Sequence, residues 1–242
     1  MFYASARQEP CTNGDGSLAL AWPCTNENFQ VIQIEAKSVP WPFMKPMVLV
    51  FCKNALLGTV KTRLAQSIGE LKALEVYQQL LQKTARTLQA SGLEAAVWHT
   101  PSSQPDPLWL EVTSSCFRQV SGDLGQRMQA GFEWAFGQGY GPVVGIGTDL
   151  WDLEATDLEQ ALELLQNKEV VIGPAADGGY YLIGMQKIQT QLFQNKAWST
   201  PDLLEQTLAD IAPEKRALLS QKNDIDTAAD LQKHPDLWGL IE

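Results

Sequence analysis

Short apolar runs and longer amphipathic segments alternate along most of the chain. The run Met47–Cys52 (MVLVFC) predicts a buried strand. Glu70–Ala90 carries apolar side chains at helical spacing, with Gly92 at the position of a C-terminal cap. Further strands are predicted at 93–99, 116–120, 142–148, 169–172 and 179–185, and further helices at 123–136, 154–166, 201–211 and 228–233.

This order of elements predicts an α/β fold: a doubly wound, mostly parallel mixed sheet with helices on both faces. Ligands of such sheets bind at the carboxyl ends of the strands. The positions to examine therefore follow Cys52, Val120, Thr148 and Ile172. Residues 1–46 differ, because they hold five prolines and show no sustained period. We expect them to be an N-terminal tail or a misplaced start, and the domain to span 47–242.

Composition narrows the class of protein. A chain of 242 residues, 45% of them hydrophobic, suits one α/β domain, and a net charge of −10 argues against nucleic-acid binding. Phosphate-bearing small molecules stay open, because they need only a few local cations. The four cysteines show no C-x-x-C spacing, which favours a reduced, cytoplasmic chain. No apolar run approaches the roughly 18 residues of a membrane span, so no membrane partner is expected. The oligomeric state is left open.

The segment after the first strand, KNALLGTVKTRL, is rich in cations. Lys53, Lys61 and Arg63 flank Gly58 within twelve residues. Such a loop at a strand end can hold a diphosphate through cations and backbone N–H groups. The spacing is not that of a Walker loop. A solvated basic turn before a helix is the structural alternative.

The segment after the third strand, SGDLGQRM, has two interpretations. Asp123 is in position to cap the following helix. Gly122 and Gly125 would alternatively let a base or a sugar approach the backbone closely.

Carboxylates follow the fourth strand and recur near the end of the chain. Asp149 lies at the end of the fourth predicted strand, after the sequence GIGT. A carboxylate at such a strand end is a suitable ligand for Mg²⁺ or Mn²⁺ that also binds phosphate oxygens. Asp152 is expected to cap the next helix. In NDIDTAADL, Thr227 and Asp230 have capping-box spacing, but a cap does not require Asp224 and Asp226 together.

The fifth strand ends in GPAADGGYY. Asp177 precedes Gly178 and Gly179, which leave space beside the backbone, so Asp177 is expected to face the same crevice as Asp149. Tyr180 and Tyr181 alternate faces on the next strand, and one of them is expected to line the pocket.

In this order, these motifs resemble the bacterial glycosyltransferase-like proteins associated with arsenosugar biosynthesis, also called radical-SAM/selenodomain-associated transferases. That family has the nucleotide-diphospho-sugar transferase (GT-A) fold and is similar to 2-phospholactate guanylyltransferase. The resemblance covers about 47–231. One departure is Trp151, where the family has proline. The matching elements lie at Lys53, Gly58, Lys61–Leu64, Gly122–Gly125, Arg127, Gly147–Asp149, Gly173, Pro174, Asp177–Tyr181, Trp198–Thr200, Asp224, Asp226 and Thr227.

The resemblance implies roles for these residues. Asp149 and Asp226 would bind Mg²⁺ or Mn²⁺, and Asp177 would act on the acceptor side as a general base or a hydroxyl-orienting group. The set implied for the nucleotide and its phosphates is Lys53, Gly58, Lys61, Arg63, Gly122, Asp123, Gly125 and Arg127. The set implied for the acceptor or sugar pocket is Gly178, Gly179, Tyr180, Trp198, Ser199 and Thr200.

Three functions stay open at this stage. The first is a metal-dependent glycosyltransferase that moves a sugar from a nucleotide-diphosphate donor to a small-molecule acceptor. The second is a nucleotidyltransferase that joins a nucleoside triphosphate to a phosphorylated small molecule and releases pyrophosphate. The third is a nucleotide-binding scaffold without activity, for which Trp151 in place of proline is the only hint.

Overall fold

The computed structural model describes residues 44–241 of the chain. The predicted N-terminal segment lies outside these residues except for its last three, and Cys11 and Cys24 lie outside them as well. Cys52 and Cys116, the cysteines within the described range, are free thiols. No helix in 44–241 is long and apolar enough to cross a bilayer.

Seven strands form one sheet in the order β3-β2-β1-β4-β6-β5-β7. β1 is parallel to β2 and β4, β2 to β3, and β5 to β7, whereas β6 runs antiparallel to β4 and β5. The predicted mostly parallel mixed sheet is therefore confirmed. The strands are β1 Met47–Lys53, β2 Glu94–Thr100, β3 Cys116–Arg118, β4 Val143–Ile146, β5 Val170–Pro174, β6 Tyr180–Met185 and β7 Arg216–Leu218.

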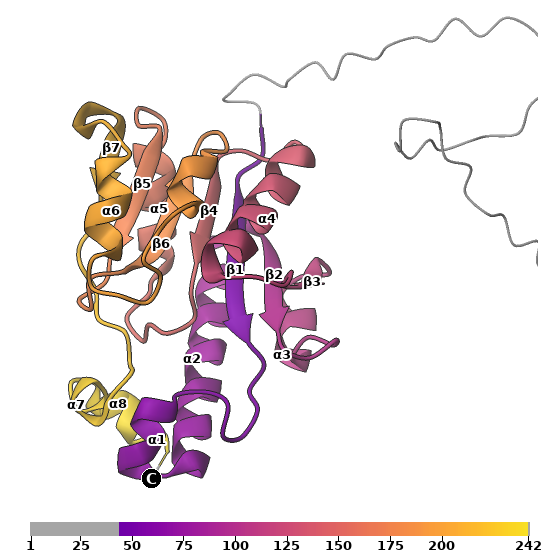
Figure 1. Ribbon diagram of the computed structural model, residues 1–242. Helices are drawn as coiled ribbons and strands as arrows, with labels where there is room; N and C mark the ends of the chain where they lie inside the picture. Colours follow the sequence, from indigo (N-terminus) through magenta and orange to yellow (C-terminus); the bar gives the residue numbers. More distant parts are fainter. Residues whose placement is uncertain (1–43, 242) are drawn as a thin grey trace, which may run out of the picture. The chain divides into compact units, whose positions relative to one another are not determined.

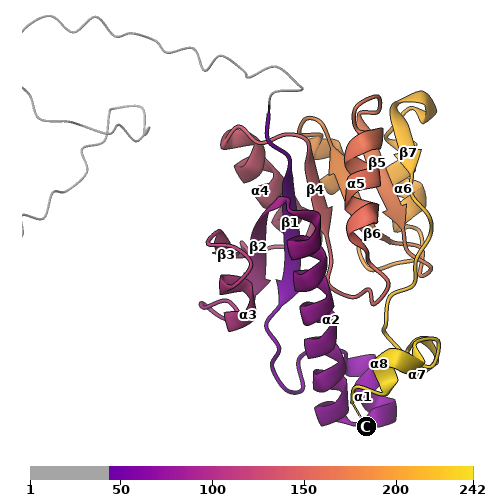
Figure 2. The same ribbon diagram turned by 180° about the vertical axis from the view of Figure 1, so that it is seen from behind.

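Helices cover both faces of the sheet, as Figures 1 and 2 show from opposite sides. One face packs against α2 (Glu70–Ser91), α3 (Pro107–Leu110) and α5 (Ala155–Leu164). The other face packs against α4 (Leu124–Gly137), the 3-10 helix η1 (Thr190–Phe193) and α6 (Leu203–Ala209). Because neighbouring strand residues point to opposite faces, β1 feeds both cores: Val48 and Val50 face α2, whereas Met47 and Leu49 face α4.

A third apolar cluster lies beyond the carboxyl end of β1. It joins α1 (Thr62–Ile68), the start of α2, α7 (Ala228–Leu231) and α8 (Pro235–Trp238). Figure 1 shows these helices together at one end of the domain, although α1 and α8 are far apart in the sequence. The C-terminal segment thereby returns to the edge of the sheet where ligands of this fold class bind.

The long helix α2 shows how the sequence pattern sets this packing. Its buried positions, among them Val76, Leu80 and Leu81, have further buried positions three or four residues away, so one stripe faces the sheet and α1. The helix ends where Gly92 takes a φ of 64° and donates its N–H to the Gln89 carbonyl, as the predicted cap requires.

The short helices α3 and α8 were not predicted, and other details also differ from the structure. The helix α1 was expected to be part of a loop, and its seven residues start within the cationic segment. β7 was not predicted, because its three residues include Arg216 and show no apolar run. The prediction that Asp152 caps the next helix is wrong, because the N-cap of α5 is Glu154. The Glu154 N–H donates to Asp157 Oδ2.

Candidate functional site

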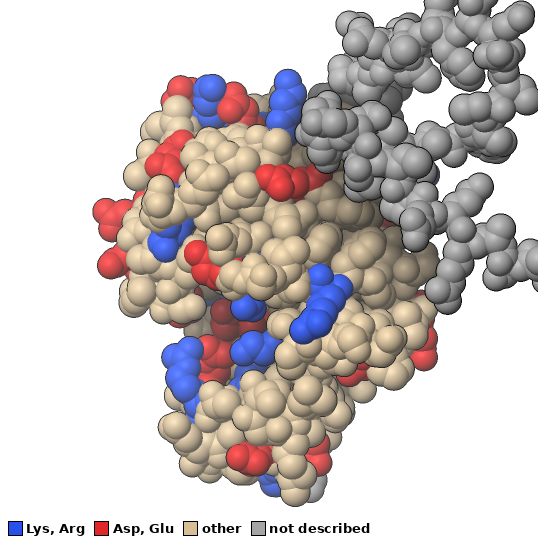
Figure 3. Space-filling model, turned by 45° about the vertical axis from the view of Figure 1, so that its right-hand side comes forward, with Lys and Arg blue, Asp and Glu red and all other residues tan. Residues whose placement is uncertain are grey.

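Two adjoining cavities open at the carboxyl edge of the sheet. The first, of about 410 Å³, lies beside the end of β1 and the start of α1. The second, of about 330 Å³, lies beside β4 and the turn between β5 and β6. Figure 3 shows a hollow on the molecular surface in which positive and negative side chains lie next to one another. Both cavities are lined by Phe51, Arg63, Leu124, Asp149, Ser199 and Asp226.

The first cavity gathers the cations predicted for phosphate binding. Lys53, Lys61, Arg63 and Arg127 all line it. They come from the end of β1, the N-terminus of α1 and the first turns of α4, which are separate in sequence. The four side chains therefore converge on one space, as predicted. The alternative of a solvated basic turn is excluded for Lys61, because its side chain is only 3% exposed.

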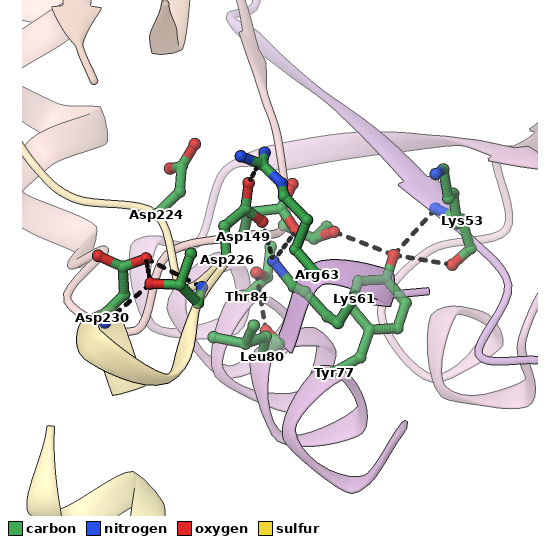
Figure 4. Close-up of polar contacts among 12 residues, drawn as sticks. Lys53, Lys61, Arg63, Tyr77, Leu80, Thr84, Asp149, Asp224, Asp226 and Asp230 are labelled. Atoms are coloured by element: carbon green, nitrogen blue, oxygen red, sulfur yellow. Dashed lines mark hydrogen bonds and ion pairs between the residues drawn. The ribbon is translucent and has the colours of Figure 1, made fainter. Parts of the chain in front are cut away.

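The Tyr77 hydroxyl links two strand ends beneath this cavity. It accepts the Lys53 N–H at 2.9 Å and lies 3.0 Å from the Lys53 carbonyl and 3.3 Å from Thr148 Oγ1 (Figure 4). Burial raises the pKa of Tyr77, so the hydroxyl keeps its proton and can act as donor as well as acceptor. The end of β1 is therefore fixed against the residue that precedes Asp149.

Lys61 joins both carboxylates predicted to bind a metal. Its Nζ donates to Asp149 Oδ1 at 2.5 Å and to Asp226 Oδ1 at 3.2 Å, and Arg63 Nη2 donates to Asp226 Oδ2 at 2.6 Å (Figure 4). Burial alone would lower the pKa of Lys61, but the charges of Asp149 and Asp226 raise it. Lys61 is therefore cationic across the neutral pH range.

The backbone holds this cluster in an uncommon conformation. Lys61 has a φ of 47° at the N-cap of α1, and Ser199, which also lines the first cavity, has a φ of 62°. Left-handed backbone at a residue with a side chain costs about 1 kcal/mol or more, and such residues cluster at functional sites. The Ile225 N–H donates to the Asp149 carbonyl at 2.9 Å, which fixes the C-terminal segment beside β4.

The two carboxylates fit a divalent cation. Because Asp149 and Asp226 both contact one nitrogen atom, a cation in that position would contact both. Within 44–241 no group of three or more His, Cys, Asp or Glu side chains could hold a metal by itself. Mg²⁺ is commonly bound by one or two carboxylates together with substrate phosphates, and this pair next to a cationic cavity matches that pattern.

The second cavity combines carboxylates with aromatic rings. Asp177 lines it together with Asp149, as the sequence predicted. Asp177 Oδ1 also accepts the Gly179 N–H at 2.9 Å, so part of its role is to close the turn between β5 and β6. Tyr180 and Tyr181 both line this cavity, and Tyr181 is 5% exposed and belongs to the core as well. The core position predicted for one tyrosine is confirmed, whereas the strict division of the two between core and pocket is not.

Asp224 is a site residue that the candidate set lacked. It lines the second cavity, and burial together with the charges of Asp149 and Asp177 raises its pKa to about 7. Figure 4 shows its carboxylate apart from the Lys61 cluster. The signal in the sequence was the presence of two aspartates, Asp224 and Asp226, where a helix cap needs neither.

Two of the predicted glycines serve close packing. A Cβ atom at Gly125 would lie 2.2 Å from the Phe193 carbonyl oxygen and 2.5 Å from the Trp198 ring. At Gly178, where φ is 90°, a Cβ would lie 2.2 Å from the Pro201 carbonyl oxygen. Neither glycine lines the two cavities. Both instead bring the 193–201 segment, which carries Trp198, Ser199 and Thr200, against the site.

The remaining predicted residues lie around the site. Gly179, Trp198, Ser199 and Thr200 line the second cavity. Asp123 caps α4 by accepting the Gln126 N–H at 2.8 Å, so the capping interpretation is confirmed for it. Gly58 and Gly122 line neither cavity, but the Gly122 carbonyl accepts from Arg127 Nε at 2.9 Å and so positions a cation of the first cavity.

Trp151 is accommodated away from both cavities. Its Nε1 donates to Asp236 Oδ2 at 2.6 Å, and its ring packs with the cluster of α1, α7 and α8. The residue therefore tethers α8 to the loop after β4. Its presence leaves Asp149 at the wall of both cavities.

Comparison with solved structures relates this fold to nucleotide-handling transferases. A protein of Desulfovibrio desulfuricans G20, provisionally assigned as a nucleotide-diphospho-sugar transferase, is 27% identical with a TM-score of 0.70, over 80% of this chain and 96% of that one. A nucleotidyl transferase from Methanothermobacter thermautotroptrophicus is 15% identical, with a TM-score of 0.56 over 80% and 98% of the two chains. The 4-diphosphocytidyl-2C-methyl-D-erythritol synthase of Anaerococcus prevotii is 11% identical, with a TM-score of 0.52 over 81% and 99%.

These likenesses establish the predicted nucleotide-diphospho-sugar transferase fold and support an enzyme of the transferase class. A search of curated proteins gave no match. The arsenosugar association has no counterpart in these findings. Residues 81–200, which include Asp149 and Asp177, match the model of the DUF2064 family, described as an uncharacterized protein conserved in bacteria.

Proposed function

We propose that the protein is a metal-dependent glycosyltransferase that moves a sugar from a nucleotide-diphosphate donor to a small-molecule acceptor. The observation that carries this proposal is the position of Lys61, Arg63, Asp149 and Asp226. The four charged groups form one cluster at the boundary of two cavities, of which one is rich in cations and the other in carboxylates and aromatic rings.

The donor diphosphate belongs in the first cavity. Lys53, Lys61, Arg63 and Arg127 line it, and charge-assisted hydrogen bonds from such groups are the strong contacts to phosphate. Asp149 and Asp226 hold Mg²⁺ or Mn²⁺ in this proposal. The bound cation would offset the charge that develops on the leaving diphosphate.

The acceptor belongs in the second cavity, beside Asp177. One oxygen of that carboxylate is held by the Gly179 N–H, which orients the other for a ligand. Asp177 then accepts the proton of the acceptor hydroxyl as the new glycosidic bond forms. Tyr180, Trp198, Ser199 and Thr200 shape the pocket around the acceptor and the sugar.

A thermal-shift screen tests the donor half of the proposal. Nucleoside mono-, di- and triphosphates and nucleotide sugars are compared with and without Mg²⁺ or Mn²⁺. A ligand at 100 times its Kd stabilises the folded state by about 2.7 kcal/mol, which is readily detected. We expect a metal-dependent shift with one nucleotide-diphosphate sugar; silence with every nucleotide would contradict the proposal.

The reaction product separates glycosyl from nucleotidyl transfer. Glycosyl transfer releases a nucleoside diphosphate, whereas nucleotidyl transfer to a phosphorylated small molecule releases pyrophosphate. We expect nucleoside diphosphate and no pyrophosphate in an assay that measures both.

A further inference from the structure

The charges that line the second cavity are mostly negative. Four aspartates and one arginine line it. Arg63 is paired with Asp226, and Lys61, which lines the first cavity, contacts Asp149 and Asp226. Among residues 44–241, neither Asp177 nor Asp224 forms an ion pair. Lys222, the lysine closest to Asp224 in the sequence, is itself paired with Asp157, with 3.0 Å between Nζ and Oδ2.

A bound metal and a donor would leave this imbalance in place. A divalent cation held by Asp149 and Asp226 would be shared with the diphosphate of the donor. Asp177 and Asp224 lie outside that set and would still face the second cavity without a cation partner. A phosphate or carboxylate placed there would be repelled by the Asp177 carboxylate, and by the Asp224 carboxyl group once it is ionised, because like charges repel at short range.

The other walls suit a ligand with hydrogen-bond donors and an apolar face. The rings of Phe51, Tyr180 and Trp198 are half-buried and line the cavity. Aromatic faces of this kind pack against the C–H faces of sugars and against cations. The Tyr180 hydroxyl itself is buried and has no hydrogen-bond partner among the described residues, so Tyr180 presents its ring and not its hydroxyl to this cavity.

We infer that the acceptor is a hydroxyl-bearing molecule without negative charge, such as a polyol or an amino sugar, and that phosphorylated and carboxylated molecules are excluded by Asp177 and Asp224. This inference rests on the proposed function, because it assigns the acceptor to the second cavity. The acceptor hydroxyl forms the bond to the anomeric carbon, and the bond from that carbon to the diphosphate breaks. The nucleoside diphosphate leaves with the electron pair, and Asp177 takes the hydroxyl proton.

Matched pairs of acceptors test the inference. Glucosamine is compared with glucosamine 6-phosphate, and glycerol with glycerol 3-phosphate, using the donor and metal that the thermal-shift screen identifies. We expect the uncharged or amino member of each pair to stimulate nucleoside diphosphate release above the hydrolysis background, and its phosphate to do so at least about tenfold less. Preferred use of the phosphorylated member would overturn the inference.

Substitution of one carboxylate tests the cause of the preference. At a pH well above 7, where the Asp224 carboxyl group is ionised, we expect Asp224→Asn to narrow the preference for the uncharged member of a pair severalfold, because one like charge is removed. Glu163→Gln is the matched control: it changes the net charge equally on an exposed position of α5 and should leave the discrimination unchanged. An unaltered preference in Asp224→Asn would contradict the assignment to this cavity.

A binding measurement keeps the inference separate from the proposed function. Saturation-transfer NMR detects glucosamine and glucosamine 6-phosphate on the protein with Mg²⁺ present, whether or not any donor turns over. Binding of glucosamine alone supports the charge preference, and tighter binding of the phosphate overturns it. Release of nucleoside diphosphate with a phosphorylated acceptor would contradict this inference but remain consistent with glycosyl transfer. Release of pyrophosphate would contradict both the inference and the proposed glycosyl transfer.

Discussion

At the scale of residues, the charged groups of the candidate site differ in their partners. Lys61 contacts two carboxylates, Arg63 reinforces one of them, and Asp177 is oriented by a backbone N–H. Asp224 has no ion-pair partner among the described residues, and its pKa is raised to about 7. These differences allow the roles of the aspartates to be separated by single substitutions.

Asp149→Ala should abolish metal-dependent nucleotide binding while the domain stays folded. The substitution removes one of the two carboxylates that contact Lys61, whereas Asp226 keeps its ion pairs with Lys61 and Arg63. We expect the Kd for the donor in Mg²⁺ to rise at least about tenfold, to the value measured without a metal. Calorimetric titration measures it, with Glu159→Gln on the exposed side of α5 as the control. An unchanged Kd in Mg²⁺ would remove Asp149 from the metal site.

Asp177→Asn should spare donor binding and lower kcat by about 10²-fold, the scale of a lost general base. The asparagine side-chain oxygen can still accept the Gly179 N–H, so the turn is expected to survive. Steady-state kinetics with a fixed donor gives the result. Equal turnover in the variant and the wild type would exclude Asp177 from the chemistry.

Asp224 should make stability depend on pH in the absence of a metal. Its folded pKa of about 7 lies above the ordinary aspartate pKa of 3.8, so between these values the folded state binds more protons than the unfolded state. Stability from this group therefore falls as pH rises from about 4 to about 7. In EDTA, Asp224→Asn should raise Tm at pH 8 more than at pH 4.5; equal changes would contradict the shifted pKa.

At the scale of elements, the site depends on close packing between α4 and the 193–201 segment. Gly125 is buried under the Phe193 carbonyl and the Trp198 ring, and both Trp198 and Ser199 line the second cavity. The helix and the segment hold the aromatic wall in place together. A change in the distance between them should disturb stability and the second cavity at once.

Gly125→Ala should lower the free energy of unfolding by about 1–3 kcal/mol, because its Cβ would overlap backbone as well as a ring. Urea denaturation measures the change. Gly137→Ala, at the end of the same helix with no atom within 4 Å of its Cβ, is the control and should be neutral or stabilising by up to about 1 kcal/mol. Equal stabilities in the two variants would show that the contact with Trp198 is loose.

At the scale of the whole domain, hydrophobic periodicity was enough to predict the sheet and its main helices. Long patterned segments such as Glu70–Ser91 carry many consistent positions, so local errors do not change the assignment. Short elements were missed, since the three residues of β7 and the seven of α1 give too few positions for a period. Both belong to edges where packing against neighbours decides the conformation.

The candidate site was predicted in part. Strand ends indicated Asp149, Lys53 and the cationic segment, because topology alone brings carboxyl ends to one edge. The contact between Lys61 and Asp149 was not predictable, since side-chain pairing across 88 positions depends on the three-dimensional register. Gly125 was assigned to ligand contact, but its space is filled by Trp198, a distinction that a single sequence does not contain.

Packing of the C-terminal helices against α1 should matter for the stability of the domain. Leu237 of α8 is fully buried in that cluster, and Leu237→Ala should cost about 2–5 kcal/mol through the cavity it leaves. Leu240→Ala, at a position 55% exposed, is the control and should change stability by less than about 0.5 kcal/mol. Chemical denaturation compares them, and similar small losses in both would mean that α8 packs weakly.

The ion-pair cluster around Lys61 draws on three distant stretches of chain: the segment after β1, the end of β4, and the C-terminal segment with Asp226. A fragment limited to residues 81–200 would keep Asp149 and Asp177 but none of Lys61, Arg63 and Asp226. The donor binding proposed above would therefore require all three stretches of chain at once. It can serve as a reporter of completed folding, since it should appear only when the last residues have docked against the first helix.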